Sequence, residues 1–222
     1  MQTSGNRTAK PVITVGADPE VFFIKDGKPY PAIGLVGGTK LFPRKVRIGA
    51  VQEDNVMAEF NIPPCTTAEK FSKSIETMLG EIQNIAKKAG CDVSIVPYAE
   101  FDPKYLQHPQ AMEIGCEPDY DAWNYVQNKR PSYELLKNIR TASGHIHIGF
   151  KDPDADPLRR KKVVAACDLY LGLPSLLIDK DTVRRQFYGK AGAYRPKKYG
   201  IEYRVLSNFW IKEDRWRRWA FS

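Results

Sequence analysis

Alternation between apolar and polar residues predicts most of the strands of this chain. Residues 12–24 form one such strand, and its continuously apolar end, Val21-Phe-Phe-Ile24, indicates burial on both faces. The pair Asp26-Gly27 follows it and predicts a type I′ hairpin into residues 28–30. Residues 52–55 are expected to form a turn. Further strands are expected over residues 40–51, 56–62, 92–98, 140–150 and 200–206.

Apolar residues three and four apart predict a long helix over residues 67–89, capped by Thr66 or Thr67 and ended by Gly90. A second helix is expected over residues 158–171 and is predicted to break at Gly172-Leu-Pro174. Residues 133–139 are expected to lead into the next strand, residues 183–199 to form a mobile loop, and residues 210–219 to begin a final amphipathic helix. Hairpins interleaved with a few helices predict the α+β class with a mostly antiparallel sheet.

The composition is that of a folded protein of 222 residues with 42% hydrophobic residues. We expect a flexible tail over residues 1–10 and a single domain over residues 11–222. No apolar run reaches the length of a secretory signal or of a membrane span, so we expect a soluble, cytoplasmic protein. Four cysteines without a Cys-x-x-Cys spacing favour a reducing compartment. Cys116 is either a nucleophile without a recognisable histidine partner or a structural thiol.

The formal net charge of +8 is concentrated near one end of the sequence. Residues 182–222 contain eleven Lys or Arg and three Asp or Glu, so this segment carries the whole excess. Such a basic segment fits nucleic acid, and it equally fits the phosphates of a nucleotide or an acidic substrate.

Charged and imidazole side chains occur within four of the predicted strands. Burying such a side chain without a partner costs several kcal/mol, roughly 2 to 7 even for a neutral polar group. Because side chains two apart in a strand share a face, each pair points to one side. The ordinary alternatives are a solvated edge, a satisfied core histidine and an ion pair between strands. Divalent metal ions with phosphate would partner the whole set at once. The residues are Asp18 and Glu20, Glu59, His145 and His147, and Glu202 and Arg204.

These segments together resemble the glutamine synthetase and glutamate–cysteine ligase superfamily, most closely its small phage-encoded carboxylate–amine ligases. Gly16-Ala-Asp-Pro-Glu-Val-Phe-Phe23 is similar to the opening Gly-x-Glu-x-Glu-Phe-Phe strand of the family. Ser143-Gly-His-Ile-His-Ile-Gly149 resembles its Gly-x-His-x-His strand. Ile201-Glu-Tyr-Arg204 resembles its late Glu-x-Arg strand, and Ala58-Glu-Phe60 the strand that presents another glutamate to metal. The order along the chain agrees over residues 12–211.

The resemblance implies a curved sheet with helices packed on one face and an ATP-dependent enzyme that joins a carboxylate to an amine through an acyl phosphate. Because water would hydrolyse an acyl phosphate, we expect the mobile segment over residues 184–199 to form a lid. The substrates would be small molecules or peptides, and the oligomeric state is left open. Two or three Mg²⁺ ions, or Mn²⁺, would be bound by Asp18, Glu20, Glu59, His145 and Glu202, while His147 and Arg204 would contact nucleotide phosphate and Arg195 would stabilise the transferred phosphoryl group.

Two departures from the family pattern stand out. Aspartate at position 18 is shorter than the family's glutamate, so a metal there is expected to shift or to bind through water. Only residues 211–222 follow the late strand, which leaves little chain to close the family fold.

Two other functions remain open at this point. A nucleic-acid-binding protein would stack bases on the terminal tryptophans, and a metal-dependent hydrolase or nuclease would use the same acidic cluster. The first leaves the acidic and histidine strands unexplained, so nucleic acid is the less favoured partner. The basic, aromatic end consists of Trp210, Trp216 and Trp219 with Arg215, Arg217 and Arg218, three arginines expected on a solvent-exposed face. A phage-encoded protein of any of these kinds would act in the host cytoplasm.

Overall fold

The computed structural model describes residues 13–113, 118–129, 131 and 136–222. Three predictions fall on residues outside these ranges: the tail over residues 1–10, Cys116, and residues 133–135 of the lead-in segment. The strands are β1 (Thr14–Lys25), β2 (Lys28–Tyr30), β3 (Arg44–Val46), β4 (Gly49–Asp54), β5 (Met57–Asn61), β6 (Asp92–Ser94), β7 (Tyr98–Glu100), β8 (Tyr120–Asp121), β9 (Val126–Gln127), β10 (Ile139–Thr141), β11 (Gly144–Gly149), β12 (Ala193–Lys197) and β13 (Gly200–Tyr203). The helical elements are α1 (Ala68–Lys88), η1 (Pro103–Gln107), α2 (Pro109–Met112), α4 (Arg159–Cys167), η2 (Asp168–Gly172), α5 (Leu173–Ile178), η3 (Arg184–Gln186), η4 (Asn208–Ile211) and α6 (Asp214–Phe221).

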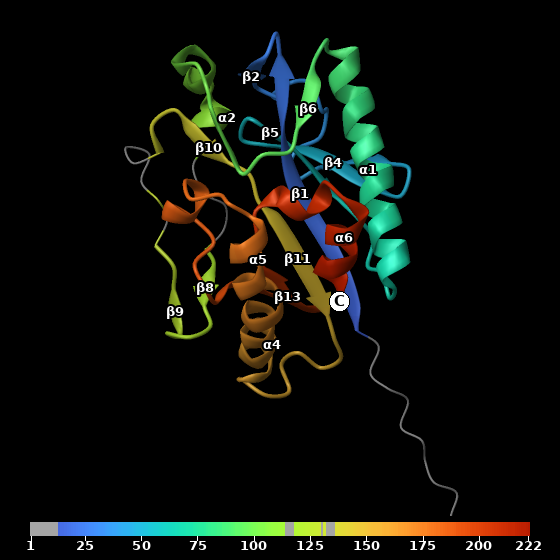
Figure 1. Cartoon of the computed structure of the whole chain (residues 1–222), viewed down its shortest axis with the longest axis vertical. Helices are drawn as coiled ribbons and strands as arrows, with labels where there is room; N and C mark the ends of the chain where they lie inside the picture. Colours follow the sequence, from blue (N-terminus) through green and yellow to red (C-terminus); the bar gives the residue numbers. More distant parts are fainter. Residues whose placement is uncertain (1–12, 114–117, 130, 132–135) are drawn as a thin grey trace, which may run out of the picture.

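One large curved sheet organises these elements, in the order β3-β4-β5-β1-β11-β13-β12-β8-β9. β2 and β6 pair with β1 at its far end, and every pairing within the described residues is antiparallel. In Figure 1, α5 and α6 lie in front of β11 and β1, α4 lies below them near the end of β11, and α1 stands at the right of the view. The predicted α+β class and antiparallel sheet are therefore confirmed. No helix of the described ranges combines the length and the apolarity that crossing a bilayer requires.

The two faces of the central strands have opposite chemistry, because successive side chains point to opposite sides. One face contributes Val21, Phe60 and Ile201 to the main hydrophobic core, which the helices complete with Phe71 and Val164. The other face carries the acidic and imidazole residues. A one-residue slip of any of these strands would exchange the two sets, so burial of the core face fixes the register.

The predicted long helix and first hairpin are confirmed. Thr67 caps α1, its hydroxyl accepting a hydrogen bond from the Lys70 amide at 3.3 Å, and Gly90 follows the helix with φ +68°. In the hairpin, Asp26 and Gly27 have φ +50° and +74°, as a type I′ turn requires.

Three predicted strands are each divided in the structure, and the first is residues 40–51, which form β3 and the start of β4 on either side of a turn. Residues 92–98 form β6, which pairs with β1, and the start of β7, which pairs with β10. Pro97 lies at the change of partner, because it has no amide hydrogen to donate to a ladder. Residues 140–150 likewise form β10 and β11, and between them the Ser143 amide turns to the Glu20 carboxylate at 2.7 Å.

The predicted helix break at Gly172-Leu-Pro174 is wrong. The chain stays helical from Arg159 to Ile178, because the π-type segment η2 connects α4 directly to α5. Pro174 lies in the first turn of α5, directly after the π-type segment.

The prediction of a mobile loop over residues 183–199, and with it the lid over residues 184–199, is also wrong. β12 is an interior strand of the sheet, bonded to β13 on one side and to β8 on the other. Arg184 is only 1% exposed. Glycine, tyrosine and basic residues suggested flexibility, but the tyrosines and arginines of this segment pack and form hydrogen bonds.

The predicted C-terminal helix begins later than expected. Trp210 lies in η4, is fully buried, and donates its indole hydrogen to the Gly144 carbonyl at 3.1 Å. Arg217 was expected on a solvent-exposed face and is instead 9% exposed, donating to the Ser72 hydroxyl at 2.9 Å and to the Ile211 carbonyl at 3.0 Å. These contacts tie α6 to α1 and to η4.

We expect Arg217→Ala to lower the free energy of unfolding by about 1 to 3 kcal/mol, because it leaves the buried Ile211 carbonyl without its donor. Arg215→Ala is the matched control, since Arg215 forms an exposed ion pair with Glu213. Urea unfolding followed by circular dichroism measures both variants. Equal stability of the two would contradict a structural role for Arg217.

Candidate functional site

Strand register brings the predicted site residues together on one face of the sheet. Asp18 lies opposite His145 between β1 and β11, and Glu20 lies opposite Glu59 between β1 and β5. His147 lies opposite Glu202 between β11 and β13. Arg195 of β12 lies opposite Glu202 on its other side. The residues identified by period-two spacing therefore share one surface across five adjacent strands.

The first acidic group consists of Asp18, His145 and Glu202, which offer donor atoms within 4.8 Å of one another. His145 Nδ1 lies 3.4 Å from Asp18 Oδ1 and 3.7 Å from Glu202 Oε1. His147 joins this group at its edge, with Nε2 3.0 Å from Asp18 Oδ1. The Tyr199 hydroxyl contacts the other ring nitrogen of His147 and so orients the imidazole.

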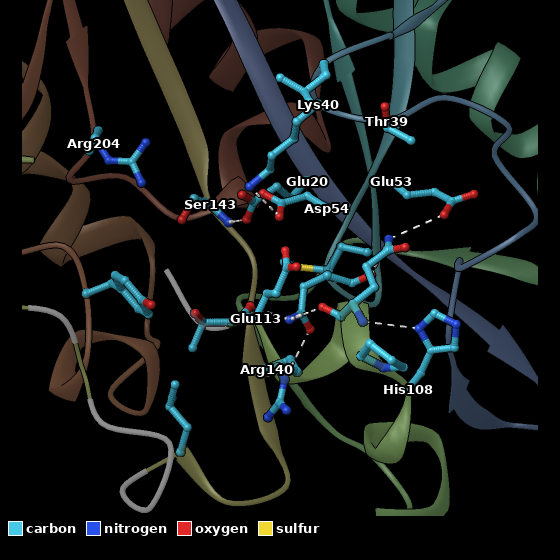
Figure 2. Close-up of a pocket in the computed structure, with 18 of the residues that line it drawn as sticks. Glu20, Thr39, Lys40, Glu53, Asp54, His108, Glu113, Arg140, Ser143 and Arg204 are labelled. Carbon is cyan, nitrogen blue, oxygen red and sulfur yellow. Dashed lines mark hydrogen bonds and ion pairs between the residues drawn. The ribbon is translucent and has the colours of Figure 1, made fainter. Parts of the chain in front are cut away.

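The second acidic group consists of Glu20, Asp54 and Glu59, again within 4.8 Å of one another. Figure 2 shows Glu20 and Asp54 beside each other, with the Lys40 side chain directed to them. The Lys40 ammonium lies 2.7 Å from Asp54 Oδ1.

Sequence reasoning missed Asp54 because residues 52–55 were expected to form a turn. The reversal occupies only residues 55 and 56, with Asn55 at φ +55°, so β4 extends through Asp54. Predicting a two-residue turn would have placed Asp54 on the same face as Glu59. The signal for such a turn was Asn55, because asparagine tolerates positive φ.

Burial and mutual repulsion disfavour the charged forms of the second group. Burial, reinforced by the charge of Asp54, raises the pKa of Glu20 to about 8. Burial also raises the pKa of Glu59 well above its ordinary value, and the charges of Asp18, Asp54 and Glu20 act in the same direction. Three close carboxylates on a buried surface thus lack enough positive charge from the protein alone.

In the first acidic group, by contrast, neighbouring side chains favour the charged form of the carboxylate. Burial by itself would raise the pKa of Asp18, but the charge of His147 and the close approach of both imidazoles hold it well below its ordinary value. Asp18 in turn raises the pKa of His147 despite the burial of that ring. Burial lowers the pKa of His145, and the neighbouring Arg204 guanidinium adds to this, which leaves a neutral imidazole with a lone pair for coordination.

Glu202 is only 1% exposed, and three cationic side chains contact it. Arg195 donates to its two oxygens at 3.0 and 3.1 Å, Lys197 lies 2.7 Å from Oε2, and Arg204 contacts Oε1. Burial and Asp18 raise the pKa of Glu202, but the neighbouring His145 imidazole and the guanidinium groups of Arg204 and Arg195 outweigh them and lower it to about 2. The predicted phosphate-binding arginines are therefore held at the carboxylate predicted to bind metal.

The donor set fits divalent metal ions. Carboxylate oxygens with one neutral imidazole suit Mg²⁺ or Mn²⁺. Asp18 Oδ1 and His147 Nε2 are both buried, and within the described residues neither has a hydrogen-bonding partner of acceptable geometry, although they lie 3.0 Å apart. Atoms that converge in this way without bonding to each other are placed as ligands of a common ion would be.

A buried network supports the second acidic group from behind. The Ser143 amide donates to Glu20, and the Ser143 hydroxyl accepts a hydrogen bond from Arg184 at 2.9 Å. Asn208 donates to the Glu20 carbonyl at 2.8 Å. Arg184 carried no signal in the sequence, because exposed arginines are common and its burial depends on tertiary packing.

The indole of Trp210 occupies the space beside Gly144. A Cβ atom on Gly144 would lie 2.4 Å from the indole nitrogen. The glycine is therefore required by packing rather than by a bound molecule.

Two cavities border the site. The first, of about 610 Å³, is lined by Glu20 and Asp54 and is bordered by residues 39–42. The second, of about 430 Å³, is lined by Asp119 and by residues 126–129 and 187–190. Arg204 and Tyr188 line both cavities, so these two side chains lie where the hollows adjoin.

Comparison with known proteins agrees with the motifs. Residues 138–220 match the model of a family described as phage phiEco32-like COOH.NH2 ligase-type 2. No curated protein matches the chain. The matched segment contains the histidine strand β11, the arginine strand β12 and the Glu-x-Arg strand β13. The resemblance to phage-type carboxylate–amine ligases is thus confirmed over that segment, and it supports an enzyme that forms C–N bonds.

We expect metal binding to release protons at neutral pH, because a carboxyl whose pKa is about 8 must ionise before it coordinates. The sign follows for stability as well: without metal, the folded protein holds protons that the unfolded chain has lost, so its stability falls as pH rises from about 4.5 to 8.

Titration calorimetry with MgCl₂ in two buffers of different ionisation enthalpy measures the released protons. The number should fall between pH 7 and pH 9, and Glu20→Gln should reduce it at pH 7. A heat of binding independent of the buffer would contradict the expected ionisation.

Proposed function

We propose that this protein is an ATP- and Mg²⁺-dependent ligase that joins a carboxylate to an amine through an acyl phosphate. The observation that carries the proposal is the location of two carboxylate groups on one sheet face with guanidinium groups in contact with one of them. The family match to β11, β12 and β13 supports the same chemistry.

We assign the metal ligands to both groups. Asp18, His145 and Glu202 would hold one ion, and Glu20 and Glu59 with Asp54 would hold another, with space for a third left open. When bound, Mg²⁺ supplies positive charge to the oxygens of ATP and to the phosphoryl group in transfer. The shorter Asp18 is close enough to His145 and His147 to share an ion with them.

Arg195, Arg204 and His147 are the proposed phosphate contacts. A planar guanidinium can pair with two phosphate oxygens, and such preorganised charge typically contributes several kcal/mol to the transition state. Arg204 lines both cavities, so a phosphoryl group passing between a nucleotide in one and a carboxylate in the other would meet it. The amine would then displace phosphate from the acyl group.

Water must be kept from an acyl phosphate, because hydrolysis would waste it. Residues 184–199 as a whole do not form this lid, because Arg184 is buried and β12 is paired on both sides within the sheet. We assign the role of the lid to residues 39–42 instead. These residues line the larger cavity and have two exposed apolar side chains, Leu41 and Phe42. Gly37 and Gly38 precede them.

The nucleic-acid alternative loses support from the buried positions of Trp210 and Arg217. A metal-dependent hydrolase would use the same acidic groups, and the requirement for an amine distinguishes it from a ligase. The free, buried thiols of Cys65, Cys91 and Cys167 fit the reducing cytoplasm, which for a phage-encoded protein is that of the host.

We expect Glu20→Gln, Asp54→Asn and Glu202→Gln each to lower ADP release by at least about 100-fold, because each removes an anionic ligand at nearly constant volume. Glu100→Gln on the exposed face of β7 is the matched control and should retain activity. The measurement is ADP release with ATP, MgCl₂ and pairs of amino acids or short peptides.

Release of ADP should require both an acid and an amine. ADP release that needs neither would favour the hydrolase. Wild-type turnover by Glu20→Gln or Glu202→Gln in limiting Mg²⁺ would contradict the metal assignment.

A further inference from the structure

A stripe of exposed apolar side chains runs along the continuous helical segment from α4 to α5. Five residues form it, and each is at least half exposed. They are Leu169 (56%), Tyr170 (69%), Leu173 (58%), Leu176 (51%) and Leu177 (77%). We call this set the leucine stripe. No residue of the leucine stripe lines either cavity.

Helix geometry places these side chains on one side. Leu173 follows Leu169 by four residues and precedes Leu177 by four, which is the spacing of one helical face. The intervening Leu171 and Gly172 are buried, against the core and the Tyr203 hydroxyl. The π-type segment η2 thus turns Asp168, Leu171 and Gly172 inward and leaves Leu169 and Tyr170 outward.

The leucine stripe carries no charge along its length. Asp168 lies at its start and is buried, its two oxygens accepting hydrogen bonds from Tyr203 and Trp123 at 2.7 and 2.6 Å. Lys162, which precedes the stripe, already contacts Asp156 at 3.1 Å. A surface without charges needs no oppositely charged partner.

The size of the leucine stripe exceeds what scattered surface residues explain. The exposed fractions of these four leucines and one tyrosine leave roughly 600 Å² of mainly apolar surface, the upper end for the largest patch on a typical monomer, and such patches often mark interaction sites. Two copies of the stripe in contact would bury about 1,200 Å², the lower end of the range for specific protein interfaces.

We propose that the leucine stripe is the contact surface of a homodimer in which two copies pack these helices across a twofold axis. A twofold contact requires a surface that is complementary to itself. An uncharged row of leucines satisfies this condition, because each leucine packs equally well against its counterpart.

The proposed dimer leaves the candidate active site open. α4 packs on β12 and β13 through the core face of the sheet, whereas the acidic groups lie on the opposite face. The two sites of the dimer therefore face away from the contact, and association and catalysis can be tested separately.

Light scattering coupled to size-exclusion chromatography, with the full chain at 5 to 100 µM, tests the proposal. The expected mass is about twice the 25.2 kDa of one chain. Leu173→Glu combined with Leu177→Glu should give the monomer mass, because it would place four carboxylates in the interface. Ile48→Glu, at an exposed position of the β3–β4 turn, is the matched control and should remain dimeric.

A wild-type chain that stays monomeric at 100 µM would overturn the proposal, as would a dimer unaffected by the double substitution. Circular dichroism of the variant must match the wild type, and a second double variant, Leu173→Ser with Leu177→Ser, provides the test should the glutamates prevent folding. Wild-type monomer that binds vesicles containing phosphatidylserine, while the variant does not, would assign the leucine stripe to a membrane surface and reject the dimer.

Discussion

The burial of several carboxylates on one face of one sheet is the constraint on which the rest of this structure depends. An unpaired charge in a protein interior costs several kcal/mol, so each carboxylate needs a partner or must take up a proton. The two acidic groups meet this demand differently. Histidines and arginines surround Asp18 and Glu202, whereas Glu20 and Glu59 have raised pKa values and their group is contacted by the Lys40 ammonium.

This difference indicates which ligands the two groups favour. The carboxylates of the second group need added positive charge to ionise, and hard divalent cations can supply it. The first group combines a candidate set of metal ligands with guanidinium and ammonium side chains that can pair with phosphate. Metal-bound nucleotide would therefore satisfy both groups at once, which neither Mg²⁺ nor ATP alone can do.

The strands themselves were predictable because each carries its own signal. Period-two spacing correctly assigned Asp18 with Glu20 and His145 with His147 to one face, and the Asp26-Gly27 turn and the α1 cap were local. Asp54 was missed because the length of a turn decides which face follows it. The burial of Arg184, Trp210 and Arg217 was missed because it depends on packing between segments far apart in the sequence, and the same is true of β12, whose polar sequence resembles a loop.

The central claim is that a carboxylate attacks the terminal phosphoryl group of ATP between these two groups. The most direct measurement uses ¹⁸O in the carboxyl group of the acid from a productive substrate pair and follows the label by mass spectrometry. One labelled oxygen should appear in inorganic phosphate for each amide formed, because the acyl phosphate transfers it. Phosphate free of label, or label found in AMP, would contradict the account.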